Sequence, residues 1–156
     1  MSDITRSEDI IIKELGLIQD VIKRMASNSF LVKGWAISLV VATLLFKGSQ
    51  IQVFIAFIPL ISFWILDAYY LRQERLYRRL YEWVIKNRKE SDEFLFDLNA
   101  NRFKDQVSSL TGVMFSETLI YFYVSMTLLL MFYILLMIIL NHPSTGVIIN
   151  GTPCIL

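Results

Sequence analysis

The 156-residue chain has few of the residues that form cross-links or metal sites, with one Cys, Cys154, and one His, His142. A single Cys cannot form a disulfide within the chain, so a disulfide framework is excluded. His142 has no Cys, Asp or Glu near it at metal-ligand spacing, so we expect no metal and no cofactor. Motifs of nucleotide-binding loops, serine hydrolases and zinc proteases are also lacking. We therefore predict no catalytic residue and do not expect an enzyme.

Long flexible linkers are also unexpected, because the chain has six Gly and three Pro. Apolar residues, by contrast, make up 55% of it, and they concentrate in runs over residues 29–46, 51–70 and 119–140. About 18 to 20 consecutive apolar residues suffice for a helix to cross a bilayer. The sequence therefore predicts an all-α integral membrane protein with three transmembrane helices. Pro59 should kink the second, and the first should serve as the targeting signal.

Basic residues are distributed unevenly among the polar segments. Four lie before residue 29 and nine lie in residues 71–116, whereas the turn between the first two runs has one and the tail has none. The positive-inside rule then places the N-terminus in the cytoplasm and the C-terminus in the periplasm of a bacterial inner membrane. The expected segments are a cytoplasmic helix (1–28), a transmembrane hairpin (29–70, spans 29–46 and 51–70), a cytoplasmic helical module (71–116), a third transmembrane helix (117–140) and a periplasmic tail (141–156).

Helical periodicity extends both spans of the hairpin into the cytoplasm. The stripe before the first span consists of Ile11, Leu15, Ile18, Ile22 and Met25, with Glu14 placed off it. The second span continues as an amphipathic helix to about Lys86. We expect these two stalks to pack against each other or against a neighbouring subunit.

A break is expected after the second stalk, followed by helical structure that returns to the membrane. Ser91 and Asp92 should cap a short helix, and a further helix should cover residues 98–109. Phe94, Phe96 and Phe103 should form an apolar side. Helix extensions and connector would together make a small cytoplasmic helical bundle.

The densest charge pattern is a set of arginines spaced three and four residues apart, which places them along one side of a helix: Arg72, Arg75, Arg78 and Arg79. Topology and contact with anionic lipid headgroups account for such a cluster. The alternative is a site for an anionic cytoplasmic ligand, a nucleotide or DNA oligomer, because guanidinium groups suit phosphate. Lys86 joins that candidate site. Tyr77, Tyr81 and Trp83 could stack on bases, and Arg88, Lys89, Arg102 and Lys104 could extend the basic surface.

Polar residues within the spans give further candidates. Lys33 and Asp67 lie at similar depth in the hairpin and are expected to form an intramembrane charge pair. On the third span, the candidate pore and gate residues share one face: Glu117, Tyr121, Ser125 and Phe132.

Small residues also recur at a spacing of four in the first span, at Gly34, Ser38 and Ala42. This spacing permits close approach of helices. We expect it to serve packing within the hairpin, with packing between subunits as the alternative.

Two stretches together resemble a family of small bacterial three-span membrane proteins: residues 19–35, QDVIKRMASNSFLVKGW, and residues 64–81, WILDAYYLRQERLYRRLY. Within it, the chain resembles the membrane effector of the Hailong antiphage defence system. The resemblance implies an oligomeric ion channel controlled by short single-stranded DNA oligomers that a nucleotidyltransferase partner makes. It does not imply which residues bind them.

We therefore expect a homo-oligomer in contact with membrane lipids, for instance a tetramer. It would form a channel in bacterial antiphage defence that is gated by a cytoplasmic nucleotide or DNA oligomer and disrupts the inner membrane. The alternative is a membrane anchor or scaffold, without channel activity, that recruits a cytoplasmic partner through the stalks.

Overall fold

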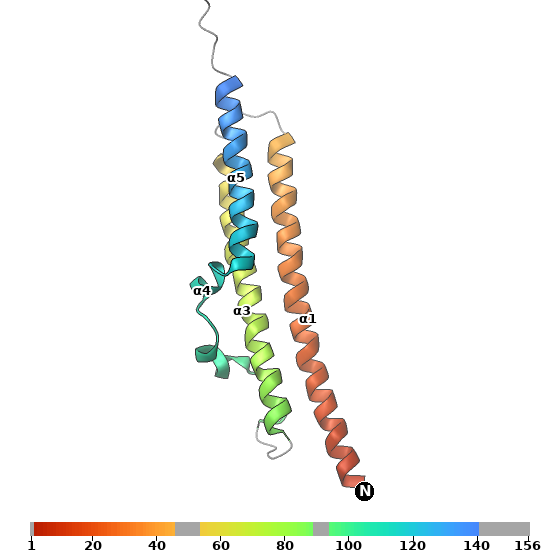
Figure 1. Ribbon diagram of the computed structural model, residues 1–156. Coiled ribbons are helices and arrows are strands. Elements are labelled where there is room, and N and C mark those ends of the chain that lie inside the picture. The colour runs from red at the N-terminus through yellow and green to blue at the C-terminus, as the bar shows by residue number, and fades with distance from the viewer. Residues whose placement is uncertain (1, 46–53, 89–93, 141–156) are drawn as a thin grey trace, which may run out of the picture.

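The computed structural model describes residues 2–45, 54–88 and 94–140. These residues form three long helices that lie side by side, with two short helices beside the second long helix of the chain (Figure 1). The long helices are α1 (Ser2–Leu45), α3 (Phe57–Asn87) and α5 (Glu117–Leu140). The short ones are the 3-10 helix η1 (Ala100–Gln106) and α4 (Leu110–Met114). No strand occurs in the described ranges, so the all-α prediction is confirmed.

Helix α1 is unbroken over 44 residues, about 66 Å at the rise of an α-helix. Its glycines, Gly16 and Gly34, are isolated and do not interrupt it. The expected single helix from the polar N-terminal segment into the first apolar run is therefore present. The second stalk is likewise continuous with its apolar run, because α3 ends at Asn87.

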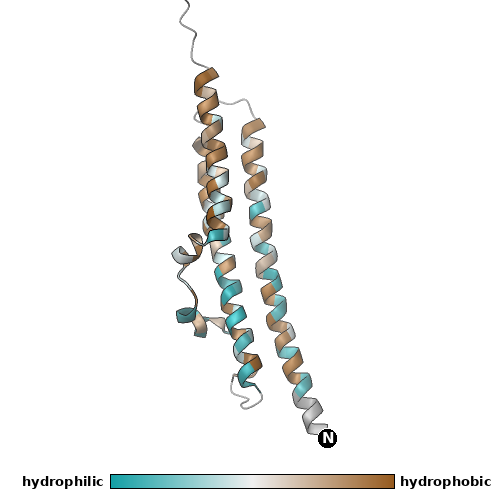
Figure 2. Cartoon of the chain, in the orientation of Figure 1, coloured by the Kyte–Doolittle hydropathy of each residue, from teal (hydrophilic) through white to brown (hydrophobic). Residues whose placement is uncertain are grey.

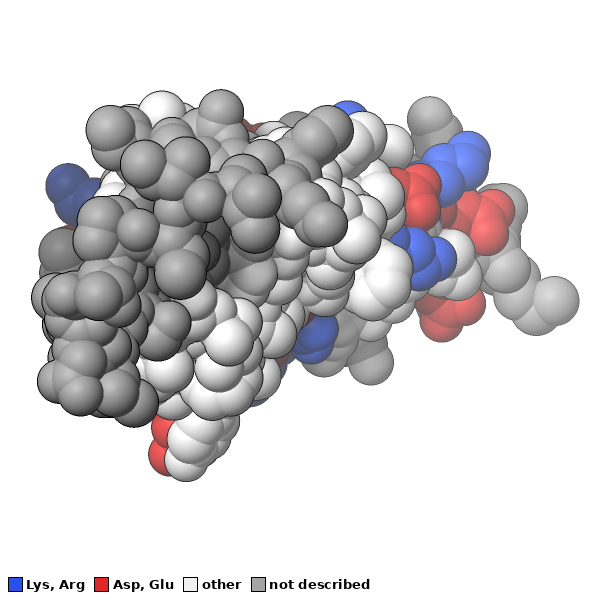
Figure 3. Space-filling view, turned by 90° about the horizontal axis from the view of Figure 1, so that it is seen from above, with Lys and Arg blue, Asp and Glu red and all other residues white. Residues whose placement is uncertain are grey.

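Helices α1 and α3 each have an apolar half and a polar half, and α5 lies beside the apolar halves and is itself mostly apolar (Figure 2). In a view turned by 90°, the described atoms near the viewer are mostly uncharged, and charged side chains are seen toward the margin and farther away (Figure 3). Two helical stretches, Glu8–Leu45 and Glu117–Leu140, are long and apolar enough to cross a membrane. The apolar part of α3 from Phe57 to residue 70 is about 21 Å long, and residues 51–53 of the expected second span lie outside the described residues.

Pro59 lies in the first turn of α3 rather than in the middle of a helix. Residues 54–55 are helical, but Ala56 is a turn residue and α3 begins at Phe57. A proline ring clashes with the carbonyl group four residues earlier, which here belongs to Ile55. Pro59 also has no amide to bond that carbonyl. Ala56 nevertheless keeps helical dihedrals, φ −63° and ψ −21°, so the hydrogen bonding is interrupted here while the backbone stays helical.

Two clusters of buried side chains hold the helices together. The three-helix core lies between the long helices α1, α3 and α5 in the apolar half, with one residue from α4. It consists of Ala36, Val40, Ala56, Leu60, Ala68, Val113, Leu119, Tyr123, Leu130 and Ile134. The stalk core joins α1, α3 and η1 in the polar half and consists of Ile18, Leu76, Leu80, Val84, Ala100 and Phe103. The two stalks therefore pack on each other, one of the two arrangements expected.

The connector differs from the predicted helical bundle. Residues 94–108, which we call the strap, contain a turn, the 3-10 helix and the extended residue Val107 in place of a helix over 98–109. Asn99 accepts a hydrogen bond from the Asn101 amide, and Asp97 accepts one from the Asn99 amide. Such local side-chain bonds compete with regular helix. The predicted Ser91–Asp92 cap lies outside the described residues.

The predicted apolar side of three phenylalanines is also wrong in part. Phe103 is buried in the stalk core, but Phe94 and Phe96 are each 45% exposed. Both have positive φ, at 61° and 57°, a left-handed conformation that residues with a side chain rarely adopt. The strap therefore begins with a strained turn rather than with a helix.

Candidate functional site

A groove lies between the polar half of α3 and the strap. Its α3 wall carries Arg75, Arg78, Arg79 and Glu82, and its strap wall carries Gln106, Val107 and Ser108. The hollow has a volume of about 300 Å³. The arginines reach one hollow because they recur at helical spacing, and the strap supplies the second wall because Ala100 and Phe103 anchor it in the stalk core.

Two of the three groove arginines are paired with acids of their own helix. Arg78 Nη2 lies 2.7 Å from Glu74 Oε1, and Arg79 Nη1 lies 2.9 Å from Glu82 Oε2. For Arg75, the described residues provide no ion pair. The groove therefore keeps a net positive charge that an anion can neutralise. At least one guanidinium, that of Arg75, is available to bind the anion.

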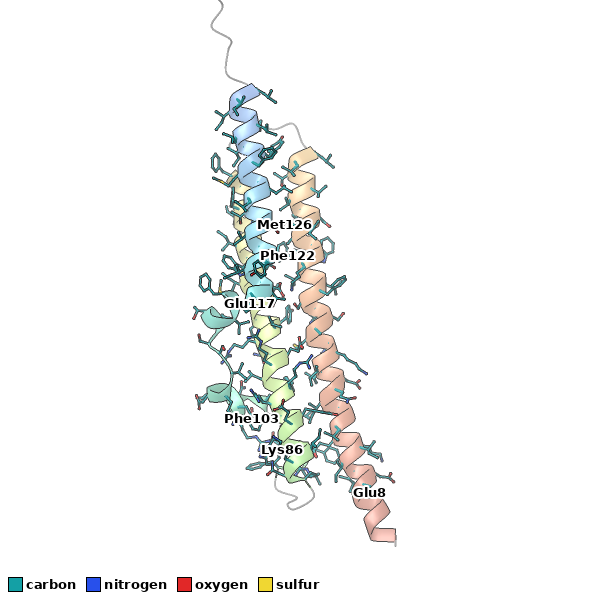
Figure 4. The ribbon with its side chains drawn as sticks, in the orientation of Figure 1. Glu8, Lys86, Phe103, Glu117, Phe122 and Met126 are labelled. Atoms are coloured by element: carbon teal, nitrogen blue, oxygen red, sulfur yellow. The ribbon has the colours of Figure 1, made fainter. Side chains whose placement is uncertain are left out.

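Lys86 lines a second hollow of about 170 Å³ together with Trp83, Asn87 and Phe103. Figure 4 shows Lys86 and Phe103 close to each other where η1 faces the end of α3. Arg79, Glu82 and Gln106 line both hollows, so the two adjoin along α3, and we call them together the groove. Four of the five residues predicted for the ligand site, all except Arg72, thus lie along one groove.

Arg72 has a different place in the structure. Its Nε donates a hydrogen bond to the Ser108 carbonyl oxygen at 3.2 Å and so ties the end of the strap to α3. It does not line either hollow. We therefore assign Arg72 to positioning the strap wall and not to ligand contact.

The aromatic residues predicted to stack on bases are mostly engaged elsewhere. The Tyr81 hydroxyl accepts a hydrogen bond from Gln19 of α1, and Tyr77 packs against the stalk core. Trp83 lines the second hollow, but the Arg88 and Arg102 guanidinium groups lie 5.5 and 5.1 Å from its ring centroid. A stacking platform made by all three rings is therefore not formed.

Two of the cations predicted to extend the basic surface are not part of it. Arg88 is buried and makes a two-bond ion pair with Glu14, at 2.6 and 2.7 Å. Arg102 lies among three rings, 4.2 Å from the centroid of Phe94, and its Nε and Nη2 have no hydrogen-bond partner in the described structure. Lys104 is exposed on η1 outside the hollows, and Lys89 lies outside the described residues.

A second polar site lies in the apolar half, where α1, α3 and α5 meet at Asp67. This carboxylate is fully buried, and Lys33 Nζ lies 2.6 Å from its Oδ2. Ser29 donates its hydroxyl proton to Oδ1. The Tyr123 hydroxyl lies 3.2 Å from Oδ2 and 3.1 Å from the Phe63 carbonyl oxygen, and its one proton serves either acceptor. The expected Lys33–Asp67 contact is thus present, with Ser29 and Tyr123 as partners that periodicity did not indicate.

The predicted pore face of α5 points away from the other described helices. Glu117, Tyr121, Ser125 and Phe132 are all exposed, and Tyr121 is 73% exposed. None of them belongs to the three-helix core. The structure therefore leaves this face open in a single chain.

The small residues of α1 are not used as expected. Gly34 and Ser38 are exposed, and a Cβ atom added at Gly34 would meet no atom within 4 Å. Val32, Ala36 and Val40 are the buried residues at this level. The prediction that the small residues pack within the hairpin is therefore wrong for Gly34 and Ser38. The face of α1 that contacts the other helices carries Val32, Ala36 and Val40 instead. Ala42 is half-buried.

The buried Glu14–Arg88 pair is the main feature that the sequence reasoning missed. A usable signal existed, because Glu14 stands three residues after Ile11 and four before Ile18 and so belongs to the apolar stripe.

Across the described ranges, no three His, Cys, Asp or Glu side chains come together as metal ligands would. No protein family, no curated protein and no solved structure matches this chain.

Proposed function

We propose that this protein is a membrane-embedded effector of bacterial antiphage defence that assembles into a homo-oligomeric channel, and that an anionic cytoplasmic ligand controls it through the arginine groove. The ligand is a nucleotide or a short DNA oligomer. The observation that carries this proposal is the groove itself, where three guanidinium groups from α3 face a second wall that the strap provides.

Membrane insertion is supported by how little of the apolar surface the fold covers. Only 22% of the most apolar window of Glu8–Leu45 and 11% of that of Glu117–Leu140 are buried. A core helix of a soluble protein would be mostly buried, whereas a hydrocarbon environment favours apolar side chains pointing outward. We place three spans in the inner membrane, with the polar half in the cytoplasm because the basic residues gather there.

The length of the groove favours a soluble ligand over a lipid headgroup. In the proposed orientation the membrane boundary lies near Tyr70, and Arg75 is about 8 Å beyond it along the helix axis. Lys86 is about 24 Å beyond it, well past a headgroup layer of roughly 5–8 Å. A lipid phosphate can therefore contact the first arginine, but a ligand that occupies the whole groove must come from the cytoplasm.

Channel formation by several copies is supported by the open face of α5. Glu117, Tyr121 and Ser125 give polarity to one side of an otherwise apolar helix, and no described helix of the same chain covers them. Polar side chains in a membrane are stabilised by facing water or another subunit. A ring of α5 helices would place this face toward a central path, with Phe132 in its apolar constriction.

The groove is tested by removing its cations and measuring the affinity for a fluorescent single-stranded oligo(dT) by anisotropy. The triple variant R75A/R78A/R79A should bind at least roughly 100-fold more weakly, since losing one charged hydrogen bond, as at Arg75, already costs about 1.5–3 kcal/mol. The matched control is K13A/R24A/K104A, which removes three exposed cations outside both hollows and should bind as the unmodified protein does. Equal affinity of both triple variants would refute the groove as the ligand site.

Competition separates the two sources of phosphate. Free pyrophosphate should displace the oligonucleotide, whereas vesicles of phosphatidylglycerol should not. Displacement by the vesicles alone would favour a lipid site.

Channel activity is tested in planar bilayers with the full chain, in the presence and absence of oligo(dT). We expect a conductance that depends on the oligonucleotide in the unmodified protein and in the control triple variant, but not in R75A/R78A/R79A. A protein that binds oligo(dT) yet never conducts would support the anchor alternative. The anchor alternative requires apolar stripes of the stalks that are free to bind a partner. It is less favoured because Ile18 of one stalk packs with Leu76 and Leu80 of the other.

A further inference from the structure

The strap has three polar attachment points, and they differ in strength. At its start, the Phe96 amide donates to Glu14 Oε1 at 3.1 Å, and the Phe94 carbonyl accepts from Arg88 Nη2 at 3.2 Å. At its middle, the Arg102 guanidinium lies among aromatic rings. At its end, the Ser108 carbonyl accepts one bond from Arg72. The first attachment involves two buried charged side chains and is therefore the strongest.

Glu14 is the link between the strap and α1. Among the described residues, it is the one α1 side chain that hydrogen-bonds to the strap. Glu14 is 1% exposed, and its buried carboxylate receives two hydrogen bonds from the Arg88 guanidinium, which compensates its charge. Helix α1 then continues without a break from Glu14 to Ser29 and Lys33, which contact Asp67 in the apolar half about 28 Å away.

The strap is also under strain where it meets this pair. Phe94 and Phe96 are held in the left-handed region, which is unfavourable for residues other than glycine. The ion pair and the two backbone hydrogen bonds hold the turn in that conformation. Lifting the strap from α3 would relieve this strain. The contacts therefore favour the docked strap and the strain favours the lifted one, as in an element with two states.

The groove and the attachment share the strap as a wall. Phe103, Gln106 and Ser108 of the strap line the groove, and Arg102 lies between Phe103 and Phe94. A ligand that bonds both to the arginines of α3 and to Gln106 or Ser108 would hold the strap against α3. Holding the strap against α3 also stabilises the turn at its start, because Arg102 packs both on Phe103, which lines the second hollow, and on Phe94 of the turn.

We infer that the Glu14–Arg88 pair is a latch through which occupancy of the groove is transmitted to α1 and thereby to the membrane spans. The inference rests on the proposed function in taking the groove as the ligand site. A ligand in the groove keeps the strap docked and the latch closed. Without ligand the closed latch is less stable, so the strained turn opens more often, Glu14 is released more often, and α1 gains freedom to move relative to α3.

Hydrogen exchange of the full chain in detergent micelles tests the latch without ligand. Glu14→Gln removes the charge but keeps the shape, and breaking a buried ion pair should accelerate amide exchange in residues 94–108 by roughly 100-fold. Asp20→Asn is the matched control, because it makes the same chemical change at an exposed position of α1 and should leave exchange unchanged. Unchanged exchange in Glu14→Gln would overturn the latch. If that variant does not fold, Arg88→Lys, which keeps the charge but not the two-bond geometry, should give a smaller acceleration.

A second arm adds oligo(dT) as the probe. In the unmodified protein it should slow exchange both in residues 94–99 and in α1 around Glu14. In Glu14→Gln it should still bind, within about threefold of the unmodified affinity, and should no longer slow exchange in α1. An equal response of α1 in both proteins would overturn the inference. Failure of oligo(dT) to bind either protein would refute the proposed function instead, while the ligand-free comparison still decides whether Glu14 holds the strap.

Discussion

The contact between Lys33 and Asp67 gives the sharpest prediction, because its two partners are buried to different extents. Asp67 is fully buried, whereas the Lys33 side chain is 25% exposed. If Lys33 is lost, the buried carboxyl group stays in place with only the Ser29 and Tyr123 hydroxyls as partners. If Asp67 is lost, the ammonium group can turn outward on its flexible stem. The cost of the two single substitutions should therefore be unequal.

The structure supports an estimate of each cost. Breaking a buried ion pair by removing one partner costs about 3–5 kcal/mol. Lys33→Met should lie near 3 kcal/mol, because two hydroxyl groups still bind the carboxylate. Asp67→Asn keeps the size of the side chain and part of its hydrogen bonding, so we expect about 1–2 kcal/mol. The double variant has no uncompensated charge and should be more stable than Lys33→Met alone, since the second substitution removes the buried anion.

The measurement is the free energy of unfolding in mixed micelles of a mild detergent and sodium dodecyl sulfate, followed by far-ultraviolet circular dichroism. Ser62→Ala is the control, because its exposed hydroxyl bonds only to the Ile58 carbonyl of the same helix and should change stability by less than about 0.5 kcal/mol. A double variant that is less stable than Lys33→Met would refute the reasoning. It would mean that the charge at Asp67 is not compensated chiefly by Lys33.

Further predictions concern ligand affinity, the helix break and the strained turn. The triple arginine variant should lower the slope of log affinity against log salt by about 2, since each phosphate contact to a single strand contributes about 0.7, and its matched control should keep the slope. Pro59→Ala should supply an amide that bonds to the Ile55 carbonyl and raise helix content by circular dichroism; no gain would mean that proline does not cause the interruption in hydrogen bonding. Phe96→Gly should leave stability equal or raise it by up to about 1 kcal/mol in chemical denaturation. Phe94→Gly should lower stability instead, because it removes the ring that packs on Arg102 and Trp83.

Much of the helical architecture follows from patterns that are local in the sequence. The apolar run up to Leu140 sets the end of α5, and the absence of a breaker between the N-terminal stripe and the first apolar run makes α1 one helix. Helical spacing likewise brings Arg75, Arg78 and Arg79 to one side of α3. These features depend on residues within a few turns of one another, and periodicity reads such short distances directly.

The candidate site, by contrast, depends on segments that are far apart in the chain. Glu14 and Arg88 are separated by 74 residues, and their contact requires the register between α1 and α3. The strap could not be recognised as a groove wall, because its anchors, Ala100 and Phe103, pack with residues of α1 and α3 that are distant in the sequence. The contact between Tyr123 and Asp67 could not be predicted either, because it arises from the packing of α5 on α3.

The sequence by itself determined an all-helical chain, the extent of its apolar runs, a row of arginines on one helix face and the similar depth of Lys33 and Asp67. Only the tertiary structure decided which charges are paired and buried, which face of α1 meets its neighbours and where the arginines acquire a second wall. The physical reason is that periodicity and hydropathy specify a helix and its apolar side, whereas the rotation and axial register of one helix against another arise from side-chain packing over the whole interface.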